Sequence, residues 1–252
     1  MSKNVLIVGY GVVGHNLYKE LNKLNIDIYD KYKTEYNTKR DIKYDFCFIC
    51  VDTPYTKEKI NDISQVVNAL LENEADTYII KSTILPTTTK GLSNMFLGKH
   101  IVFSPEYYGG TQHCNNYNFD FTILGGEKED CVKVQQLLQE VYDARHTFRI
   151  VDSTTAELCK YMENSFLATK VAFCIQFYEL AQELKINYEE LRELFILDPR
   201  VNPSHTFVYK DHPYYKSHCL DKDVPAIADY LDADLLHSVI EYNKKQKDKY
   251  NR

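Results

Sequence analysis

A cysteine between charged side chains is the residue of this sequence best suited to covalent chemistry. Cys219 lies in the segment His218-Cys219-Leu220-Asp221-Lys222-Asp223. A thiol adds readily to an aldehyde and leaves readily from an acyl group, and a nearby lysine such as Lys222 favours the reactive thiolate. The glycine-rich segment Gly9-Tyr10-Gly11-Val12-Val13-Gly14 is typical of a dinucleotide site. Together the two segments predict redox chemistry with a bound cofactor.

The glycine turn follows a predicted strand and opens a predicted helix, which is the context that a dinucleotide site requires. Glycines there permit a tight turn and let a pyrophosphate approach the helix N-terminus. Asp30 ends the second predicted strand, about 20 residues after Gly9, where a carboxylate binds the adenosine ribose. That charge repels a 2′-phosphate, so we expect NAD, although Lys31 and Lys33 leave NADP open. The other interpretation is a glycine turn without a ligand.

Composition and charge exclude some function classes. The formal net charge of −6 argues against a nucleic-acid-binding function, which requires a basic surface. The lysine-rich run at 244–249 is interpreted as an exposed helix end rather than a binding patch. No apolar segment is long enough to span a membrane, and we expect no signal peptide. We therefore expect a cytoplasmic protein.

The seven cysteines are odd in number and show no spacing of a disulfide framework. Cys47 and Cys50 form a C-x-x-C pair inside the apolar run at 46–51, which is typical of a buried strand. Cysteine in such a strand behaves as a small apolar residue. A redox or metal-binding pair is the alternative.

The chain of 252 residues divides into two regions with different patterns. In residues 1–152, short apolar runs alternate with helical segments, which predicts a Rossmann-like, doubly wound parallel sheet of the α/β class. The expected strands are 4–8, 26–30, 46–51, 77–82, 100–104 and 121–124, and the expected helices are 12–24 and 62–72. This region is the expected NAD-binding domain.

Residues 153–252 predict a small all-helical domain that carries the cysteine loop. Ser153 and Thr154 can cap a long helix that extends to about residue 184 without glycine or proline. A second helix is expected at 188–195, followed by a loop rich in proline and tyrosine at 198–218. A last helix is expected from about residue 222 to the C-terminus.

Seven short segments occur in the order in which they are found in a known family. They are the glycine turn, Cys50-Val51-Asp52-Thr53-Pro54, Lys81-Ser82-Thr83, Ser104-Pro105-Glu106-Tyr107, the run from Ala156 to Asn164, Asp198-Pro199-Arg200-Val201, and Cys219-Leu220-Asp221-Lys222-Asp223. Over nearly its whole length the sequence resembles the UDP-glucose/GDP-mannose 6-dehydrogenases.

The resemblance implies NAD-dependent oxidation of the C6 alcohol of a nucleotide sugar, as in the conversion of UDP-glucose to UDP-glucuronate. Cys219 resembles the nucleophile that captures the aldehyde as a thiohemiacetal, and a second hydride transfer then gives a thioester that water hydrolyses. A nucleotide sugar is therefore the expected substrate. No metal is expected in this chemistry.

The resemblance also implies roles for individual residues. Lys160 and Asn164, four residues apart on one helix, resemble the pair that stabilises an oxyanion and holds water. Asp223 resembles the carboxylate paired with the cysteine, and Glu106 the glutamate that assists water and substrate. Further implied contacts are Thr83, Thr53 and Lys222 for the cofactor, with Thr83 also binding the catalytic water, and Glu106, Tyr107, Tyr108, Lys160, Asn164 and Arg200 for the substrate, Arg200 reaching a neighbouring subunit. Each of these residues has a plainer interpretation as an ordinary helix or surface residue.

The sequence departs from the family pattern at several places. The resemblance ends at residues 236–243, within the family's connecting helix, and the family's third, nucleotide-binding domain has no counterpart in this sequence. Lys216-Ser217-His218 replaces glycines before the cysteine, where bulkier residues would reshape the sugar pocket. Gly110 replaces a glutamate, Ile175-Gln176 replaces Asn-Glu, and the segment at 30–45 is short.

These departures leave alternatives open. One is a minimal dehydrogenase with a different or smaller substrate, completed by oligomerisation or by a separate chain that supplies the third domain. The other is a catalytically impaired NAD-binding homologue that acts as a structural or regulatory dimer module. Because the family's connecting helix packs between subunits, we expect a homodimer formed through the helical domain.

Overall fold

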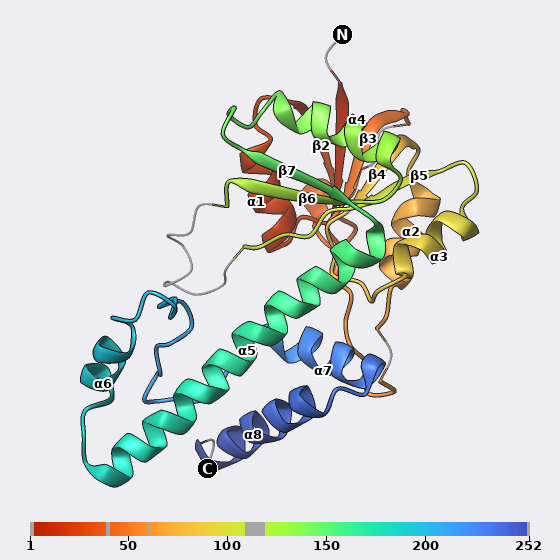
Figure 1. Cartoon of the computed structure of the whole chain (residues 1–252). Helices are drawn as coiled ribbons and strands as arrows, with labels where there is room; N and C mark the ends of the chain where they lie inside the picture. Colours follow the sequence, from red (N-terminus) through yellow and green to blue (C-terminus); the bar gives the residue numbers. More distant parts are fainter. Residues whose placement is uncertain (1–2, 39–40, 60, 109–118, 251–252) are drawn as a thin grey trace. The chain divides into compact units, whose positions relative to one another are not determined.

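The computed structural model describes residues 3–38, 41–59, 61–108 and 119–250 (Figure 1). The described residues up to Lys160 form one compact unit, and those from Tyr161 onward form a second. Helix α5 (Ser153–Leu184) contributes residues to both units. The predicted domain boundary after residue 152 lies at the start of this helix. Gly110, one of the departures from the family pattern, lies outside the described residues.

The first unit is built on a seven-stranded sheet with the order β2-β1-β3-β4-β5-β6-β7 among the described residues. The strands are β1 (Asn4–Val8), β2 (Asn25–Tyr29), β3 (Tyr44–Ile49), β4 (Ala75–Ile80), β5 (His100–Phe103), β6 (Phe121–Gly125) and β7 (Thr147–Val151). Strands β2 to β5 are parallel in this order, and β6 pairs in parallel with β7. The predicted α/β sheet is confirmed, with the correction that β5 and β6 are antiparallel and that β7 was not predicted.

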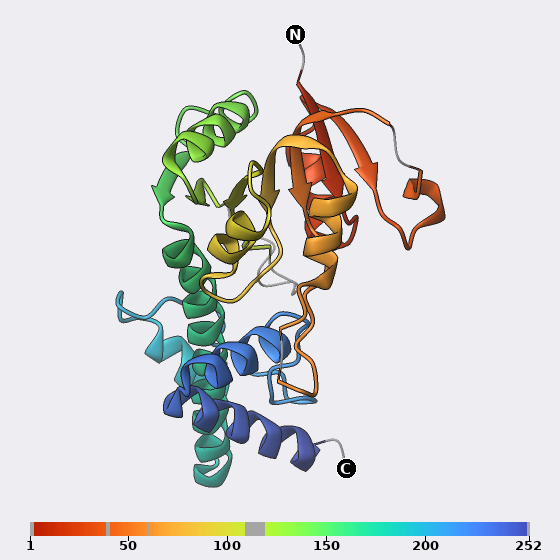
Figure 2. The same cartoon turned by 90° about the vertical axis from the view of Figure 1, so that its right-hand side faces the viewer.

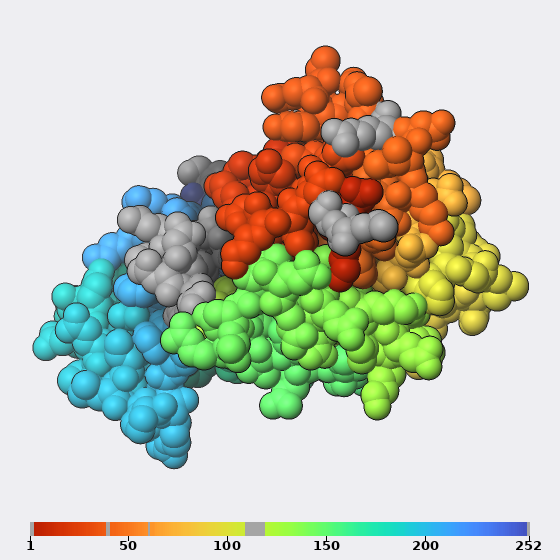
Figure 3. All heavy atoms as spheres, turned by 90° about the horizontal axis from the view of Figure 1, so that it is seen from above, coloured from red at the N-terminus to blue at the C-terminus, as the bar shows by residue number. Residues whose placement is uncertain are grey.

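Helices cover both faces of the sheet, which explains why its strands are apolar runs rather than alternating patterns. Helices α1 (Val12–Glu20) and α4 (Lys128–Gln139) contribute to the core on one face. Helices α2 (Ser64–Glu72) and α3 (Thr88–Met95) contribute to the core on the other. In Figure 3 the red N-terminal segment and the green segment that contains α4 form adjoining surfaces.

The helices of the first unit differ from the predicted ones in three ways: α1 is shorter than predicted, and α3 and α4 were not predicted. Helix α1 ends at Glu20 rather than at residue 24, because residues 21–23 form a turn in which the Leu24 N–H donates to the Leu21 carbonyl at 2.9 Å. Helix α3 was not predicted because a distant residue caps it. The buried Glu157 carboxylate, at the start of α5, accepts from the Thr87 and Thr89 N–H groups at 2.7 Å each. Such a cap leaves no trace in the sequence near α3.

The second unit is helical. It contains the rest of α5 together with α6 (Tyr188–Phe195), α7 (Leu220–Leu231) and α8 (Asp234–Tyr250). The predictions of α5 and α6 are confirmed, whereas the single terminal helix is wrong. Asp232 adopts a left-handed conformation with φ +49° and ends α7, so that a separate helix begins two residues later.

Helix α8 and the C-terminal half of α5 (Figure 2) are connected by hydrogen bonds to one carboxylate and by an apolar core. Glu179 on α5 accepts hydrogen bonds from Tyr242 Oη at 2.8 Å, Gln246 Nε2 at 2.9 Å and Lys249 Nζ at 2.6 Å, all on α8. The apolar core between α5, α7 and α8 includes Ala168, Val224 and Val239. Within the described residues, no helix has the length and apolar character needed to cross a bilayer.

Candidate cofactor and catalytic site

The three glycines after β1 meet three different steric requirements. Gly9 has φ +89°, and a Cβ there would lie 2.7 Å from the Cys50 carbonyl oxygen. A Cβ on Gly14 would lie 2.0 Å from the Gly9 carbonyl oxygen, so α1 and the turn are in direct backbone contact. A Cβ on Gly11 would meet nothing within 4 Å. Gly11 therefore leaves one side of the turn open, next to the N-terminal amide groups of α1.

Asp30, at the end of β2, is held beside this turn. Its Oδ2 accepts from the Tyr10 N–H at 2.8 Å, and its Oδ1 accepts from the Tyr32 N–H at 2.9 Å. Lys33 Nζ donates to the Tyr10 carbonyl at 2.6 Å and lies 5.3 Å from the centroid of the Tyr10 ring. Lys33, which left the NADP alternative open, is thus bound to the turn itself. Sequence reasoning did not identify this contact.

The glycine turn lies where the order of strands reverses. β1 pairs with β2 on one side and with β3 on the other, and Gly9 follows β1 next to Cys50, which follows β3. In open α/β sheets a nucleotide binds at such a point, beyond the carboxyl ends of the strands. The open side at Gly11, the helix N-terminus and the fixed Asp30 carboxylate fit a dinucleotide: the turn with Val12 and Val13 would face the pyrophosphate, and Asp30 would face the ribose.

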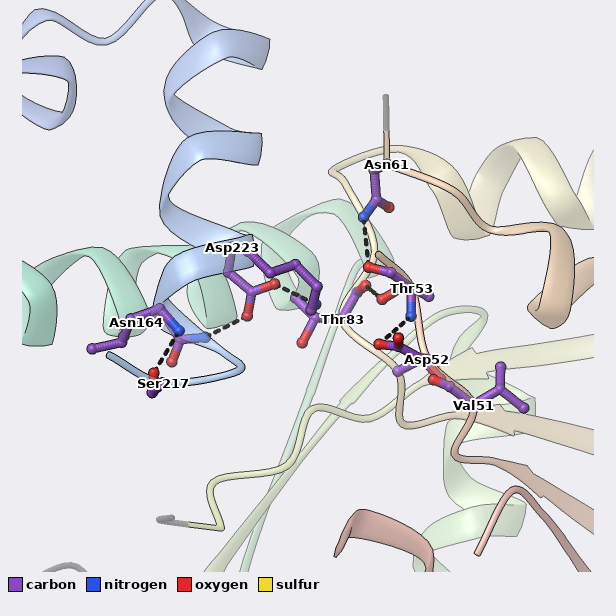
Figure 4. A network of polar contacts seen from close by, with 11 residues as sticks. Val51, Asp52, Thr53, Asn61, Thr83, Asn164, Ser217 and Asp223 are labelled. Carbon is purple, nitrogen blue, oxygen red and sulfur yellow. Dashed lines mark hydrogen bonds and ion pairs between the residues drawn. The ribbon is translucent and has the colours of Figure 1, made fainter. Parts of the chain in front are cut away.

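Thr53 and Thr83 are brought together by the loops after β3 and β4 (Figure 4). The Thr53 hydroxyl donates to the Thr83 carbonyl at 2.6 Å, and both residues are buried. The Thr53 N–H donates to Asp52 Oδ1 at 3.0 Å, and Asn61 Nδ2 donates to the Thr53 carbonyl at 3.3 Å. These bonds fix the two loops against each other at the carboxyl edge of the sheet.

Glu106, Tyr107 and Lys160 also lie close together in the first unit. The buried Glu106 carboxylate accepts from the Tyr108 N–H at 2.8 Å. Lys160 is 4% exposed, and its Nζ lies 4.7 Å from the centroid of the Tyr107 ring. Burial raises the pKa of Tyr108, and the neighbouring Glu20 carboxylate adds to the shift. The first unit thus places the buried Lys160 ammonium and the buried Glu106 carboxylate around Tyr107.

In the second unit, Asp223 is the centre of a polar group at the start of α7. It is 1% exposed, and its Oδ2 accepts from Asn164 Nδ2 at 2.7 Å while its Oδ1 pairs with Lys222 Nζ at 2.5 Å. Figure 4 shows the Asn164 and Asp223 side chains pointing toward each other. The Asp223 N–H donates to the Cys219 carbonyl at 2.8 Å, one helical turn before it. The structure therefore brings together Asn164, Lys222 and Asp223 next to Cys219.

The residues that replace the family glycines before Cys219 form a cap for α7. Ser217 Oγ accepts from the Leu220 N–H at 2.9 Å, and Asp221 Oδ2 accepts from the Ser217 N–H at 3.2 Å. These reciprocal bonds resemble a capping box, which stabilises the first turn of a helix. The cap also fixes the backbone on both sides of Cys219.

Asn243 on α8 is a site residue that sequence reasoning missed. Its Oδ1 accepts from the Tyr215 N–H at 2.8 Å, and its Nδ2 donates to the Tyr215 carbonyl at 3.1 Å. Both residues are buried, so the two bonds hold the loop before Cys219. The one signal in the sequence was an asparagine four residues after Val239, on the apolar side of the helix.

Two other sequence predictions can be placed. Arg200 is paired with Asp198 two residues earlier, and its side chain is 88% exposed. Cys47 and Cys50 are buried, and they form no disulfide. Burial raises the pKa of the Cys50 thiol to about 12. The interpretation of this pair as small core residues is confirmed.

The fold and the geometry of the glycine turn define a dinucleotide-binding α/β protein with an appended helical unit. Two sequence patterns of the UDP-glucose/GDP-mannose dehydrogenase family match the chain: the NAD binding domain over residues 20–146 and the central domain over residues 154–245. The chain belongs to this family, and NAD is its cofactor.

Individual relatives agree with this assignment. The chain is 26% identical over 296 residues to the UDP-glucose 6-dehydrogenase of Rickettsia bellii, covering 96% of this chain and 67% of that protein. It is 31% identical over 196 residues to the UDP-N-acetyl-D-mannosamine dehydrogenase of Methanocaldococcus jannaschii, covering 72% and 44%. The UDP-glucose dehydrogenase structure from Pyrobaculum islandicum shares the fold, with a TM-score of 0.80, 19% identity and coverage of 97% and 68%. The chain thus spans about two thirds or less of the length of these relatives.

Proposed function

We propose that this protein oxidises the C6 alcohol of a nucleotide sugar to a carboxylate, using NAD and a covalent intermediate on Cys219. The observation that carries the proposal is the polar group at the start of α7. There Asp223, next to Cys219, is hydrogen-bonded to Asn164 and ion-paired with Lys222. Membership of the dehydrogenase family and the fit of the glycine turn to a dinucleotide support it.

In the proposed reaction, NAD accepts one hydride in each of two oxidations. The Cys219 thiolate adds to C6 of the intermediate aldehyde, and the oxygen takes up a proton to give a thiohemiacetal. Loss of the second hydride from C6, together with the hydroxyl proton, gives a thioester. Water then cleaves the C–S bond, which releases the carboxylate and regenerates the thiol.

The side chains of each unit have proposed roles in these steps. In the second unit, Asn164 and Asp223 orient the groups around the cysteine, and the N-terminal end of α7 favours the thiolate. In the first unit, the Lys160 ammonium stabilises negative charge on the C6 oxygen, and Glu106 assists the attacking water. Thr83, fixed by Thr53, binds water beside the nicotinamide. Tyr107, Tyr108 and Arg200 are proposed substrate contacts, and Lys222 and Thr53 proposed cofactor contacts.

The proposed substrate is UDP-glucose, with two alternative substrates and one alternative function. Relatives named UDP-N-acetyl-D-mannosamine dehydrogenase make that sugar nucleotide the second substrate to test. A smaller alcohol or aldehyde is the other substrate class to test. A catalytically impaired NAD-binding module would bind NAD without reducing it.

The test follows NADH absorbance with NAD and each substrate. We expect two NADH per sugar and a carboxylate product, and we expect Cys219→Ala to abolish turnover. The matched control is Cys159→Ser, because Cys159 is an exposed cysteine that has no proposed role. NAD binding without NADH from any of these substrates would contradict the proposed activity. Activity that appears only when a separate nucleotide-binding chain is added would show that the third domain is supplied in trans.

We also propose a homodimer through one face of α5. Seven large apolar side chains of this helix are exposed, at spacings that place them on one side at about 3.6 residues per turn: Leu158, Met162, Phe166, Phe173, Phe177, Leu180 and Leu184. Met162 is 74% exposed, and contiguous apolar surface of this kind marks interaction sites. Light scattering should give the mass of a dimer, and Phe173→Glu with Leu180→Glu should reduce it to that of a monomer. A monomeric wild-type chain would refute this arrangement.

A further inference from the structure

Lys81 connects two strand ends of the first unit. It follows β4 directly, and its N–H donates to the Ile49 carbonyl of β3 at 2.9 Å. Its Nζ donates to Ser104 Oγ at 3.3 Å and to the Pro105 carbonyl at 3.2 Å. Ser104 and Pro105 follow β5 and immediately precede Glu106. The Lys81 side chain therefore bonds to the segment that carries the Glu106 carboxylate.

This segment needs such a bond because it leaves the sheet. The Ser104 N–H donates to the Ile80 carbonyl at 2.9 Å, and from Ser104 to Tyr108 the chain has neither helix nor strand structure. Ser104 is nevertheless 1% exposed, and Glu106 is buried. A buried segment without regular structure depends on side-chain donors for its carbonyl groups.

Four ionisable side chains of the first unit surround Lys81. The Glu106 and Glu20 carboxylates attract its ammonium, the Lys160 ammonium repels it, and the nearby Cys50 thiol is held neutral by burial. Burial lowers the pKa of Lys81, although the two carboxylates oppose this shift. A lysine in this position is costly unless its hydrogen bonds are needed.

We propose that Lys81 is a positioning residue for the oxidation: its ammonium fixes the Ser104–Pro105 backbone and thereby holds Glu106 and Tyr107 in place. The inference rests on the proposed function, because Glu106 and Tyr107 matter only if this side of the site takes part in the reaction. Lys81 acts through the segment and not on the substrate.

The test compares Lys81→Met with Lys81→Arg in the full chain. Misplacing a catalytic group by about 1 Å costs on the order of 100-fold in rate. We expect Lys81→Met to lower kcat by about this factor while the KM for NAD changes less than about threefold. Lys81→Arg, which keeps the charge, should recover part of the loss. Ser104→Ala, which removes one acceptor with little change in volume, should cause a smaller loss in the same direction.

The pH profile separates positioning from plain stabilisation. Because burial lowers the pKa of Lys81, its folded form binds fewer protons than the unfolded chain between the two pKa values. The free energy of unfolding therefore rises with pH in this window, while turnover falls as the positioning charge is lost. In Lys81→Arg the alkaline loss of turnover should move to higher pH. If turnover and stability change together in the wild type, the positioning role is wrong.

Hydrogen exchange of residues 104–108, followed by mass spectrometry, provides a readout that does not depend on turnover. We expect faster exchange of this segment in Lys81→Met and in Ser104→Ala, with exchange in β1 unchanged. Wild-type exchange in Lys81→Met overturns the inference. If the wild-type protein yields no NADH, the proposed function fails, and this exchange comparison alone decides whether Lys81 holds the segment.

Discussion

The glycine turn and the cysteine loop are both fixed firmly, but by different means. The turn is fixed by steric contact between residues close in sequence, since a Cβ on Gly14 would lie 2.0 Å from the Gly9 carbonyl oxygen. The loop before Cys219 is fixed by hydrogen bonds from residues far along the chain, since Asn243 lies 28 positions after Tyr215. Local steric constraints can be identified in a sequence, whereas distant polar contacts require the fold.

The difference also predicts how each region fails. A steric constraint is violated by one methyl group, and the backbone must then move. A hydrogen-bonded loop keeps its covalent geometry when a partner is removed, but it leaves buried polar groups without partners. Substitutions in the turn should therefore either leave the free energy of unfolding almost unchanged or lower it strongly. Substitutions in the loop should lower it by intermediate amounts.

The largest effect is expected for Gly14→Ala. Its methyl group would overlap the Gly9 carbonyl, so we expect a loss of about 3 kcal/mol or more in the free energy of unfolding of the first unit. Gly11→Ala is the matched control, because its Cβ meets nothing within 4 Å. The free energy of unfolding of Gly11→Ala should lie within about 0.5 kcal/mol of the wild-type value. Its NAD binding should be about tenfold weaker or more, because the methyl group occupies the open side of the turn.

Urea unfolding followed by circular dichroism, with calorimetric titration of NAD, distinguishes the two variants. Equal stability of Gly14→Ala and wild type would show that the turn can relax. Undiminished NAD affinity in Gly11→Ala would show that the open side does not face the cofactor.

A smaller effect is expected for Asn243→Leu. This change leaves the buried Tyr215 N–H and carbonyl without their Asn243 partners, at a cost of about 2 kcal/mol. The rate of Cys219 alkylation by iodoacetamide should change relative to that of Cys159 in the same protein, because the loop before Cys219 is released. The exposed Lys244→Ala on the same helix is the control and should alter neither quantity. Unchanged stability and alkylation in Asn243→Leu would show that α8 does not hold the loop.

Asp30→Ala should affect cofactor choice more than stability. It removes the carboxylate that is proposed to bind the ribose, so we expect about tenfold weaker NAD binding, or about 1.4 kcal/mol. The preference for NAD over NADP should shrink, because the repulsion of a 2′-phosphate is lost. Titration with both cofactors measures this change, and Asp76→Asn, at an exposed aspartate paired with Lys43, is the control. An unchanged ratio would place the adenosine ribose elsewhere.

The smallest effect is expected at the contact between α5 and α8. Burial alone would raise the pKa of Glu179, but hydrogen bonds from Lys249, Tyr242 and Gln246 outweigh it, and the pKa is lowered. The stability that this carboxylate contributes is therefore present above its unfolded pKa of about 4.3 and is lost as the pH falls through the lowered folded value. We expect Glu179→Gln to cost on the order of 1 kcal/mol at pH 7.

Denaturant unfolding between pH 7 and pH 3 tests this expectation. The gap between wild type and Glu179→Gln should narrow as the pH falls. A difference that stays constant over this pH range would show that the charge of Glu179 does not contribute to the contact between α5 and α8.

The elements predicted from the sequence were those with a strong local pattern. The strands with uninterrupted apolar runs, the glycine turn and the helix at 153–184 were all found within a few residues of their observed bounds. Helix α3 was missed because its cap comes from Glu157. The break after α7 was missed because Asp232 in a left-handed conformation is one of several local options for its sequence. For the site, the residues around Asp223 were predicted through family resemblance, and Asn243 and Lys81 were not.

The sequence by itself determined the glycine turn and the strands of the sheet that carries it, because glycine spacing and apolar runs act on neighbouring residues. The tertiary structure decided which distant polar groups meet: Asn243 with Tyr215, Glu157 with the start of α3, and Lys81 with the segment before Glu106. The physical reason is that a buried polar group must find a partner. Which partner it finds depends on which distant segments the fold brings together, and a local sequence pattern does not contain that information.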